Sequence, residues 1–342
     1  MAEPTAGSHI GHDESNAGLV VDVENTNSVD NDSGLGDSVA GSLLSTSLAP
    51  SILDYKFENG RRYHAYHEGK YVLPNDEQEQ DRLDLLHHIF RLILDGGLFR
   101  APLQELKPQR TLDMGTGTGI WPIELAQDFP ESMIVGNDLS AIQPNWVPPN
   151  VKFYVDDLES DWAYPQTEHF DYIHGRALIG SITDWKKLVS EVFNHLKPGG
   201  IFESQEYPCA IYSDDDTASL VPELMDWVSK LNEGCAKIGK PSANAHLIKG
   251  YMEEAGFVDV QQEIHKVPIG RWAKGHKNKE LGLFYHAQSF DAVEPMTLAL
   301  FTRVLGYTNE EAQVVIAKVK NDLRNKKAHL YVPFYFIWGR KP

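Results

Sequence analysis

Cysteine is scarce in this sequence, since only Cys209 and Cys235 occur among its 342 residues. Two isolated cysteines supply neither a disulfide framework nor the spacing of a zinc site, so we expect a reducing compartment, cytoplasmic or nuclear. No apolar run approaches the roughly 20 residues that span a bilayer, and residues 1–25 lack the basic start of a signal peptide. We therefore expect a chain that neither enters a membrane nor is secreted by that route.

Positive charge is also in short supply, because 31 Lys and Arg residues stand against 49 Asp and Glu residues and the net charge is -18. A field of this sign repels a phosphate polymer, so we expect no nucleic-acid partner. Residues 1–50 contain no Lys or Arg and no sustained apolar period. Such a segment cannot offset its ordering entropy by burial, so residues 1–50 are predicted to be a disordered, acidic, Ser-rich tail.

Short apolar runs alternate with helical patterns over residues 106–210. Strands that are separated by helices imply right-handed crossovers and a parallel sheet, which is an α/β fold with a Rossmann-like core. The predicted strands are 110–113, 133–138, 151–155, 170–174 and 201–205, and the predicted helices are 120–129 and 185–196.

Two further segments flank this core. Residues 51–105 are predicted to form an N-terminal helical cap, because Leu83, Leu86 and Phe90 recur at helical spacing. Residues 211–342 are predicted to supply a helical lid and the final strands of the sheet. Their expected helices are 220–238, 244–255 and most of 277–325, and their expected strands are 258–267 and 330–338.

A glycine loop occupies the junction between the first core strand and its helix. Residues 111–121 read Thr-Leu-Asp-Met-Gly-Thr-Gly-Thr-Gly-Ile-Trp, and glycines at such a turn let a ligand approach the backbone. Asp113 lies two residues before the first glycine, where its charge would oppose a pyrophosphate and favour a cation. S-adenosylmethionine carries a sulfonium and an ammonium group, so it is the expected cofactor. The candidate binding residues of this loop are Asp113, Gly115, Thr116, Gly117, Thr118 and Gly119.

Acidic residues also end the next two predicted strands. Asp138, followed by Leu139, can accept hydrogen bonds from both ribose hydroxyls of the cofactor. Asp157, followed by Leu158, can accept from the adenine amino group. A structural turn whose acids cap helices is the alternative interpretation. No metal site is expected, because His64 and His67 have no third ligand at useful spacing.

From about residue 54 onward the chain resembles the fungal LaeA-like, or TAM-domain, class I S-adenosylmethionine-dependent methyltransferases. The resemblance implies a seven-stranded methyltransferase sheet in which the last strand, 330–338, lies antiparallel beside the fifth. Similar proteins include regulators of secondary metabolism, tailoring O- and N-methyltransferases and some cyclases, so the resemblance leaves the substrate open. The matching pieces are 58–66, 73–77, 113–121, 138–140 with 142–144, 170–176 and 196–206.

A base is needed for methyl transfer only if the acceptor must first lose a proton. His174, at the end of the fourth core strand, is the leading candidate, and a structural hydrogen bond or a contact with the cofactor is the alternative. Glu206, at the end of the fifth strand, is the next candidate. Glu203 should point to the opposite side of that strand, so at most one of the two faces the pocket.

Aromatic residues supply two further expectations. Tyr71 and neighbouring tyrosines precede the first helix and could cover the cationic cofactor, with core packing as the alternative. The predicted lid, 277–301, would suit a flat apolar acceptor or could be ordinary helix core. Its aromatic residues are Phe284, Tyr285, His286, Phe290 and Phe301.

Two functions remain open from the sequence. The first is a methyltransferase that acts on an oxygen or nitrogen of a small secondary metabolite. The second is a LaeA-like regulatory protein that uses the same fold in a nuclear complex, with a regulatory protein as its partner. A pocket closed by aromatic helices would favour the first.

Overall fold

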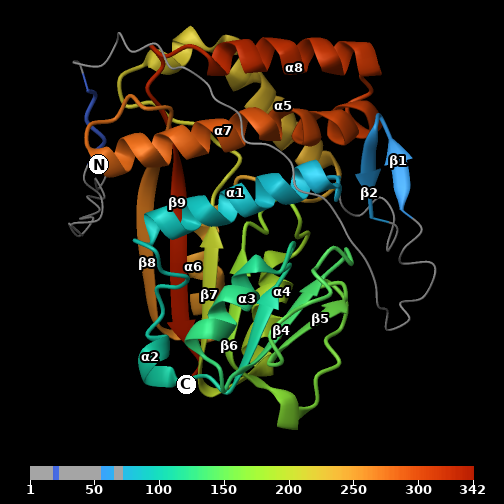
Figure 1. Ribbon diagram of the computed structural model, residues 1–342, viewed down its shortest axis with the longest axis vertical. Helices are drawn as coiled ribbons and strands as arrows, with labels where there is room; N and C mark the ends of the chain where they lie inside the picture. The colour runs from blue at the N-terminus through green and yellow to red at the C-terminus, as the bar shows by residue number, and fades with distance from the viewer. Residues whose placement is uncertain (1–17, 23–54, 65–71) are drawn as a thin grey trace, which may run out of the picture.

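A seven-stranded sheet forms the centre of the computed structural model, which describes residues 18–22, 55–64 and 72–342 (Figure 1). The strand order is β5-β4-β3-β6-β7-β9-β8, with β3 to β7 parallel and β9 antiparallel to both of its neighbours. The predicted α/β fold class and the antiparallel place of the last strand are confirmed. The strands are β3 (Arg110–Met114), β4 (Met133–Asp138), β5 (Val151–Val155), β6 (Phe170–Arg176), β7 (Leu196–Glu206), β8 (Val258–Ile269) and β9 (Leu330–Arg340).

Helices flank the sheet and build a separate layer over one end of it. Figure 1 shows α1, α5, α7 and α8 stacked above the end of the sheet to which β7 points. No helix in the described ranges is long and apolar enough to cross a membrane. The α-helices are α1 (Glu77–Ile93), α2 (Leu103–Leu106), α3 (Ile120–Asp128), α4 (Trp185–His195), α5 (Pro222–Lys237), α6 (Ile248–Ala255), α7 (His276–Ala299) and α8 (Asn309–Leu323), and a π-helical turn (Leu300–Val304) continues α7.

A small hairpin precedes α1 and was not predicted. Its strands are β1 (Lys56–Glu58) and β2 (Arg61–Tyr63), and the turn between them is Asn59-Gly60, both with positive φ. Asn-Gly is the preferred pair for a tight two-residue hairpin turn, so the signal was present in the sequence. Arg61 of β2 forms a two-point ion pair with Asp76, the residue that caps α1. The hairpin is thereby fastened to the start of the helix.

Five residues of the N-terminal segment are part of the fold. Val21 forms an antiparallel bridge with Ala273, flanked by backbone hydrogen bonds from Asp22 to Trp272 and from Lys274 to Val20. The Asp22 carboxylate also forms an ion pair with Lys279 in α7. For residues 18–22 the expectation of disorder is therefore wrong. Backbone hydrogen bonds to another segment stabilise the ordered conformation, although these residues bury no apolar face. The rest of the predicted tail lies outside the described residues.

This docked segment predicts a difference between two truncations. A chain that starts at residue 18 should unfold at the same urea concentration as the full chain if residues 1–17 add no stability. A chain that starts at residue 23 should lose about 1–3 kcal/mol, because the two backbone hydrogen bonds and the ion pair are removed. Equal stability of the two truncated chains would show that the bridge does not hold in solution.

Candidate functional site

The glycine loop joins β3 to α3 with three left-handed residues. Gly115, Gly117 and Gly119 have φ of 60°, 56° and 79°. A Cβ atom at Gly115 would lie 2.5 Å from Leu178, and one at Gly119 would lie 2.5 Å from the ring of Phe153. The loop thus needs glycine both for its backbone conformation and for the close approach of neighbouring side chains.

Polar side chains fix this loop in place. Thr116 Oγ1 donates to the Asp113 carboxylate at 2.6 Å, and Thr118 Oγ1 donates to Asp84 of α1 at 2.6 Å. The backbone N–H of Gly117 donates to Asp138 at the end of β4, at 2.8 Å. The two threonine side chains therefore tether the loop, while Asp138 lies directly against its backbone.

A crevice opens beside the loop at the carboxyl ends of β3, β4, β5 and β6. Asp138 lies in it, and burial raises the pKa of the Asp138 carboxyl. Asp113, Thr116, Thr118 and Gly119 do not line the crevice, and Tyr71 lies outside the described residues. The predicted residues that the structure brings together there are Gly115, Gly117, Asp138, Leu139, Asp157 and Leu158.

Charged side chains from other elements also enter the crevice, among them Glu79 of α1 and Arg176 of β6. Sequence reasoning missed Glu79. Arg176 Nη2 donates to His87 Nδ1 at 3.0 Å, so the other nitrogen of His87 carries the proton and donates to Glu124 at 3.1 Å. Burial lowers the pKa of His87 to about 2 and that of Arg176 to about 10. At neutral pH His87 is uncharged and Arg176 is a cation that faces the crevice.

His174 lies beneath this site and does not face it. Its Nδ1 is 2.7 Å from the Asp113 carboxylate on the adjacent strand, and the indole of Trp121 stacks on the imidazole with ring centroids 3.8 Å apart. The His174 side chain is fully buried, and it lines neither of the two cavities described here. This geometry contradicts the expectation that His174 is a base in contact with the acceptor. It also shows the Asp113 carboxylate engaged by Thr116 and His174 and not presented to a ligand.

His174→Ala is therefore predicted to act through stability. The substitution leaves the buried Asp113 carboxylate without its imidazole partner, which should lower the free energy of unfolding by about 3–5 kcal/mol. Denaturation in urea measures this loss. A stability equal to that of the unsubstituted protein would show that the Asp113–His174 pair is not formed.

Glu206 ends β7 and supports a loop of the site. Its buried carboxyl group accepts the backbone N–H groups of Leu178 and Ile179 at 3.0 and 3.1 Å. The loop begins at Ala177, a non-glycine residue with a φ of 56°. Glu206 lines neither cavity, so its direct role as a catalytic group is not supported by the geometry. Glu203 points the other way, to the backbone of Arg100 and Ala101, as predicted.

The pH dependence of stability tests the burial of Glu206. Burial raises the pKa of the Glu206 carboxyl to about 8 from its ordinary value of 4.5. Between these pH values the unfolded chain releases a proton that the folded chain retains, so the Glu206 contribution to stability falls as the pH rises from about 4.5 to 8. The side-chain amide in the Glu206→Gln variant cannot ionise. We expect urea denaturation at pH 5 and pH 8 to show a smaller decline in this variant, and parallel stability profiles would contradict the prediction.

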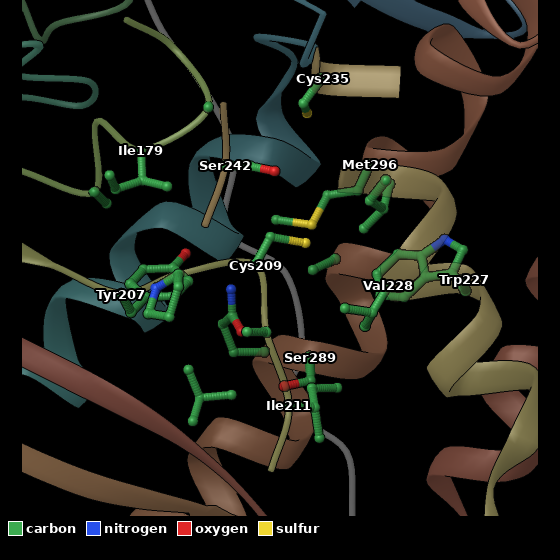
Figure 2. Close-up of a pocket in the computed structure, with 18 of the residues that line it drawn as sticks. Ile179, Tyr207, Cys209, Ile211, Trp227, Val228, Cys235, Ser242, Ser289 and Met296 are labelled. Atoms are coloured by element: carbon green, nitrogen blue, oxygen red, sulfur yellow. The ribbon is translucent and has the colours of Figure 1, made fainter. Parts of the chain in front are cut away.

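A second cavity adjoins the crevice on the far side of this loop, since Ala177 and Ser181 line both. Its volume is about 150 Å³, and Figure 2 shows side chains of the β7 end, α5 and α7 directed into it. No described residue in its wall is charged. Tyr207, Cys209 and Ile211 come from the segment after β7, Trp227 and Val228 come from α5, and Tyr285, Gln288, Ser289, Ala292 and Met296 come from α7.

Most of the predicted lid aromatics turn out to be packing residues. Among them only Tyr285 lines the cavity. Phe284 packs edge-on against His88, and Phe290 lies beneath the side chains of α8. Phe301 is fully buried, and His286 pairs with a backbone carbonyl. The helix-core alternative therefore describes these residues.

Apart from Tyr285, the wall residues of α7 were missed, although their spacing was a signal. Tyr285, Gln288, Ser289, Ala292 and Met296 follow one another at intervals that place them on one face of a helix. Their mixture of small, polar and sulfur-containing side chains is not the apolar stripe that marks a core face. No group of three or more His, Cys, Asp or Glu side chains that could hold a metal occurs in the ranges described.

Five parallel strands with a glycine loop and acidic residues at their carboxyl ends are typical of an enzyme that binds a nucleoside-containing cofactor. The chain belongs to the methyltransferase family, since a family model for a methyltransferase domain matches residues 85–262. It is an S-adenosylmethionine-dependent methyltransferase.

Several fungal proteins are similar to this chain over most of its length. Methyltransferase pytC of Aspergillus terreus is 41% identical over 298 residues, which are 87% of this chain and 91% of pytC. The secondary metabolism regulator LAE1 of Cochliobolus heterostrophus is 34% identical over 291 residues, which are 83% of this chain and 94% of LAE1. The protein-methionine methyltransferase laeA of Emericella nidulans is 36% identical, over 83% of this chain and 76% of laeA.

Proposed function

We propose that the protein methylates a neutral, largely apolar small molecule that binds in the second cavity, next to the cofactor crevice. The observation that carries this proposal is the shared wall of the two cavities at Ala177 and Ser181. An acceptor in one cavity and a methyl donor in the other would meet at this wall. An apolar wall without charged side chains disfavours an ionic acceptor, because burying an unpaired charge is costly.

The residues of the crevice fit S-adenosylmethionine, which supplies an electrophilic methyl group when bound. Asp138 would accept from the ribose hydroxyls and Asp157 from the adenine amino group, with Leu139 and Leu158 beside the adenine. The backbone of Gly115 and Gly117 leaves room for the ligand along the loop. Arg176, a cation in a crevice otherwise rich in carboxylates, would pair with the carboxylate of the amino-acid part.

Positioning is the main contribution that this site can make to the reaction. Holding a nucleophile and a methyl group in line can lower a barrier by about 7–11 kcal/mol. The described wall of the acceptor cavity contains no His, Asp, Glu, Lys or Arg that could remove a proton. The acceptor oxygen or nitrogen is then one that has a free lone pair and need not lose a proton before it is methylated. Glu206 would act by holding the loop between the two ligands.

A second candidate function is regulation within a protein complex. It is favoured by the relatives that are described as secondary metabolism regulators, at 34–36% identity. The partner would then be a regulatory protein. The apolar cavity favours the small-molecule reaction, which is why that reaction is the first proposal.

Calorimetry on the purified protein tests the cofactor site. S-adenosylmethionine and its demethylated product should bind, and NAD should not. Asp138→Ala should weaken binding of both about 10- to 100-fold, because ribose hydroxyls are left unpaired in a desolvated crevice. Gly250→Ala in α6, where an added Cβ meets no neighbour and which does not line the crevice, serves as the control. Equal affinity of Asp138→Ala and the unsubstituted protein would overturn the assignment of Asp138.

A further inference from the structure

Gln288 places an unsatisfied amide in the apolar cavity. Its side chain lies on α7 and is 2% exposed, and it lines the cavity. Within the described ranges, the amide has no hydrogen-bond partner. A glutamine amide offers two donor hydrogens and a carbonyl acceptor. The amide opens on the cavity, so a ligand there can pair with it in both directions.

Two tyrosine hydroxyls lie in the wall of the same cavity. Tyr285, one helical turn before Gln288, is 4% exposed, and Tyr207 approaches from the end of β7 (Figure 2). Neither hydroxyl has a hydrogen-bond partner in the part of the chain that the structure describes. Burial raises the pKa of both tyrosines. They therefore remain neutral, and each can both donate and accept a hydrogen bond.

Two serine hydroxyls of the cavity are already paired. Ser289 Oγ donates to the backbone carbonyl of Tyr285 at 2.7 Å, and Ser242 Oγ donates to Asn232 at 2.8 Å. On the α7 and β7 side of the cavity, the unpaired side-chain groups in the described wall are therefore those of Gln288, Tyr285 and Tyr207. The remaining wall is apolar and uncharged, and it includes Trp227, Val228 and Met296.

We infer that Gln288 is a specificity-determining residue, which binds a neutral donor-and-acceptor group of the acceptor molecule, such as a carboxamide or a lactam. This inference rests on the proposed function and names the chemistry of its acceptor. An amide group on the acceptor forms two hydrogen bonds with the glutamine amide, one in each direction. The apolar remainder of the acceptor fills the rest of the cavity. The pairing fixes the orientation in which the nucleophilic atom reaches the wall shared with the crevice.

A matched pair of probes tests the inference with the full chain, saturated with S-adenosylhomocysteine. Naphthalene-2-carboxamide carries the amide, and 2-methylnaphthalene is its apolar counterpart. The unsubstituted protein should bind the carboxamide at least about 10-fold more tightly in calorimetry. Gln288→Leu should abolish this preference, and Ser289→Ala should retain it because that hydroxyl is paired within the helix.

Thermal stability supplies an independent readout without any probe. Replacing an unpaired buried amide by an apolar group of similar size should raise the melting temperature of Gln288→Leu, whereas a structural role for Gln288 predicts a decrease. If Gln288→Leu does not fold, Gln288→Met is measured in its place. Unchanged preference for the carboxamide in a folded Gln288 variant, or no preference in the unsubstituted protein, overturns the inference.

The outcomes separate this inference from the proposed function. Failure of S-adenosylhomocysteine to bind would overturn the proposed function. Normal binding of S-adenosylhomocysteine together with equal affinity for the two probes would overturn only the role of Gln288. Absence of binding by either probe would show that the cavity does not take an aromatic amide, and the inference would be wrong.

Discussion

The two hydrogen bonds from the backbone of Leu178 and Ile179 to Glu206 hold the cofactor crevice and the apolar cavity next to each other. The loop that they fix leaves β6 through a left-handed Ala177 and turns away from the sheet between the two cavities. A backbone strained in this way is maintained only by its surroundings. Because Glu206 ends the neighbouring parallel strand, the sheet itself sets the position of the wall at which donor and acceptor would meet.

Local signals in the sequence were sufficient to predict the parallel strands of the sheet and many of the residues that line the crevice. The strand 133–138 and the strand 151–155 were predicted with the bounds that the structure shows, because alternating apolar runs and turns mark parallel strands clearly. Asp138 and Asp157 follow from the same logic, since the carboxyl ends of parallel strands meet at one edge. The antiparallel position of β9 came from the family resemblance and not from any local pattern.

Side-chain direction was beyond the reach of sequence reasoning. His174 lies two residues before the end of β6, which runs to Arg176 and not to the predicted residue 174, and its imidazole points under Trp121 because register pairs it with Asp113. The sequence of a single strand does not indicate which face of the sheet α3 will cover. Most residues that form the apolar cavity were missed for a related reason, since Gln288 and Trp227 are far apart in sequence and come together only when α5 and α7 stack over the sheet. The bridge at Val21 depends on the same kind of long-range pairing.

The position of β9 in the sheet determines when the sheet can be completed during synthesis of the chain. β9 lies between β7 and β8, although it follows both in the chain, so β8 has no neighbour in the sheet until residues 330–340 have emerged. Until then β7 and β8 expose unpaired backbone edges, which are templates for wrong association. Val332 of β9 also lines the apolar cavity, so this cavity is completed only by a strand that follows, in the chain, the other described residues of its wall.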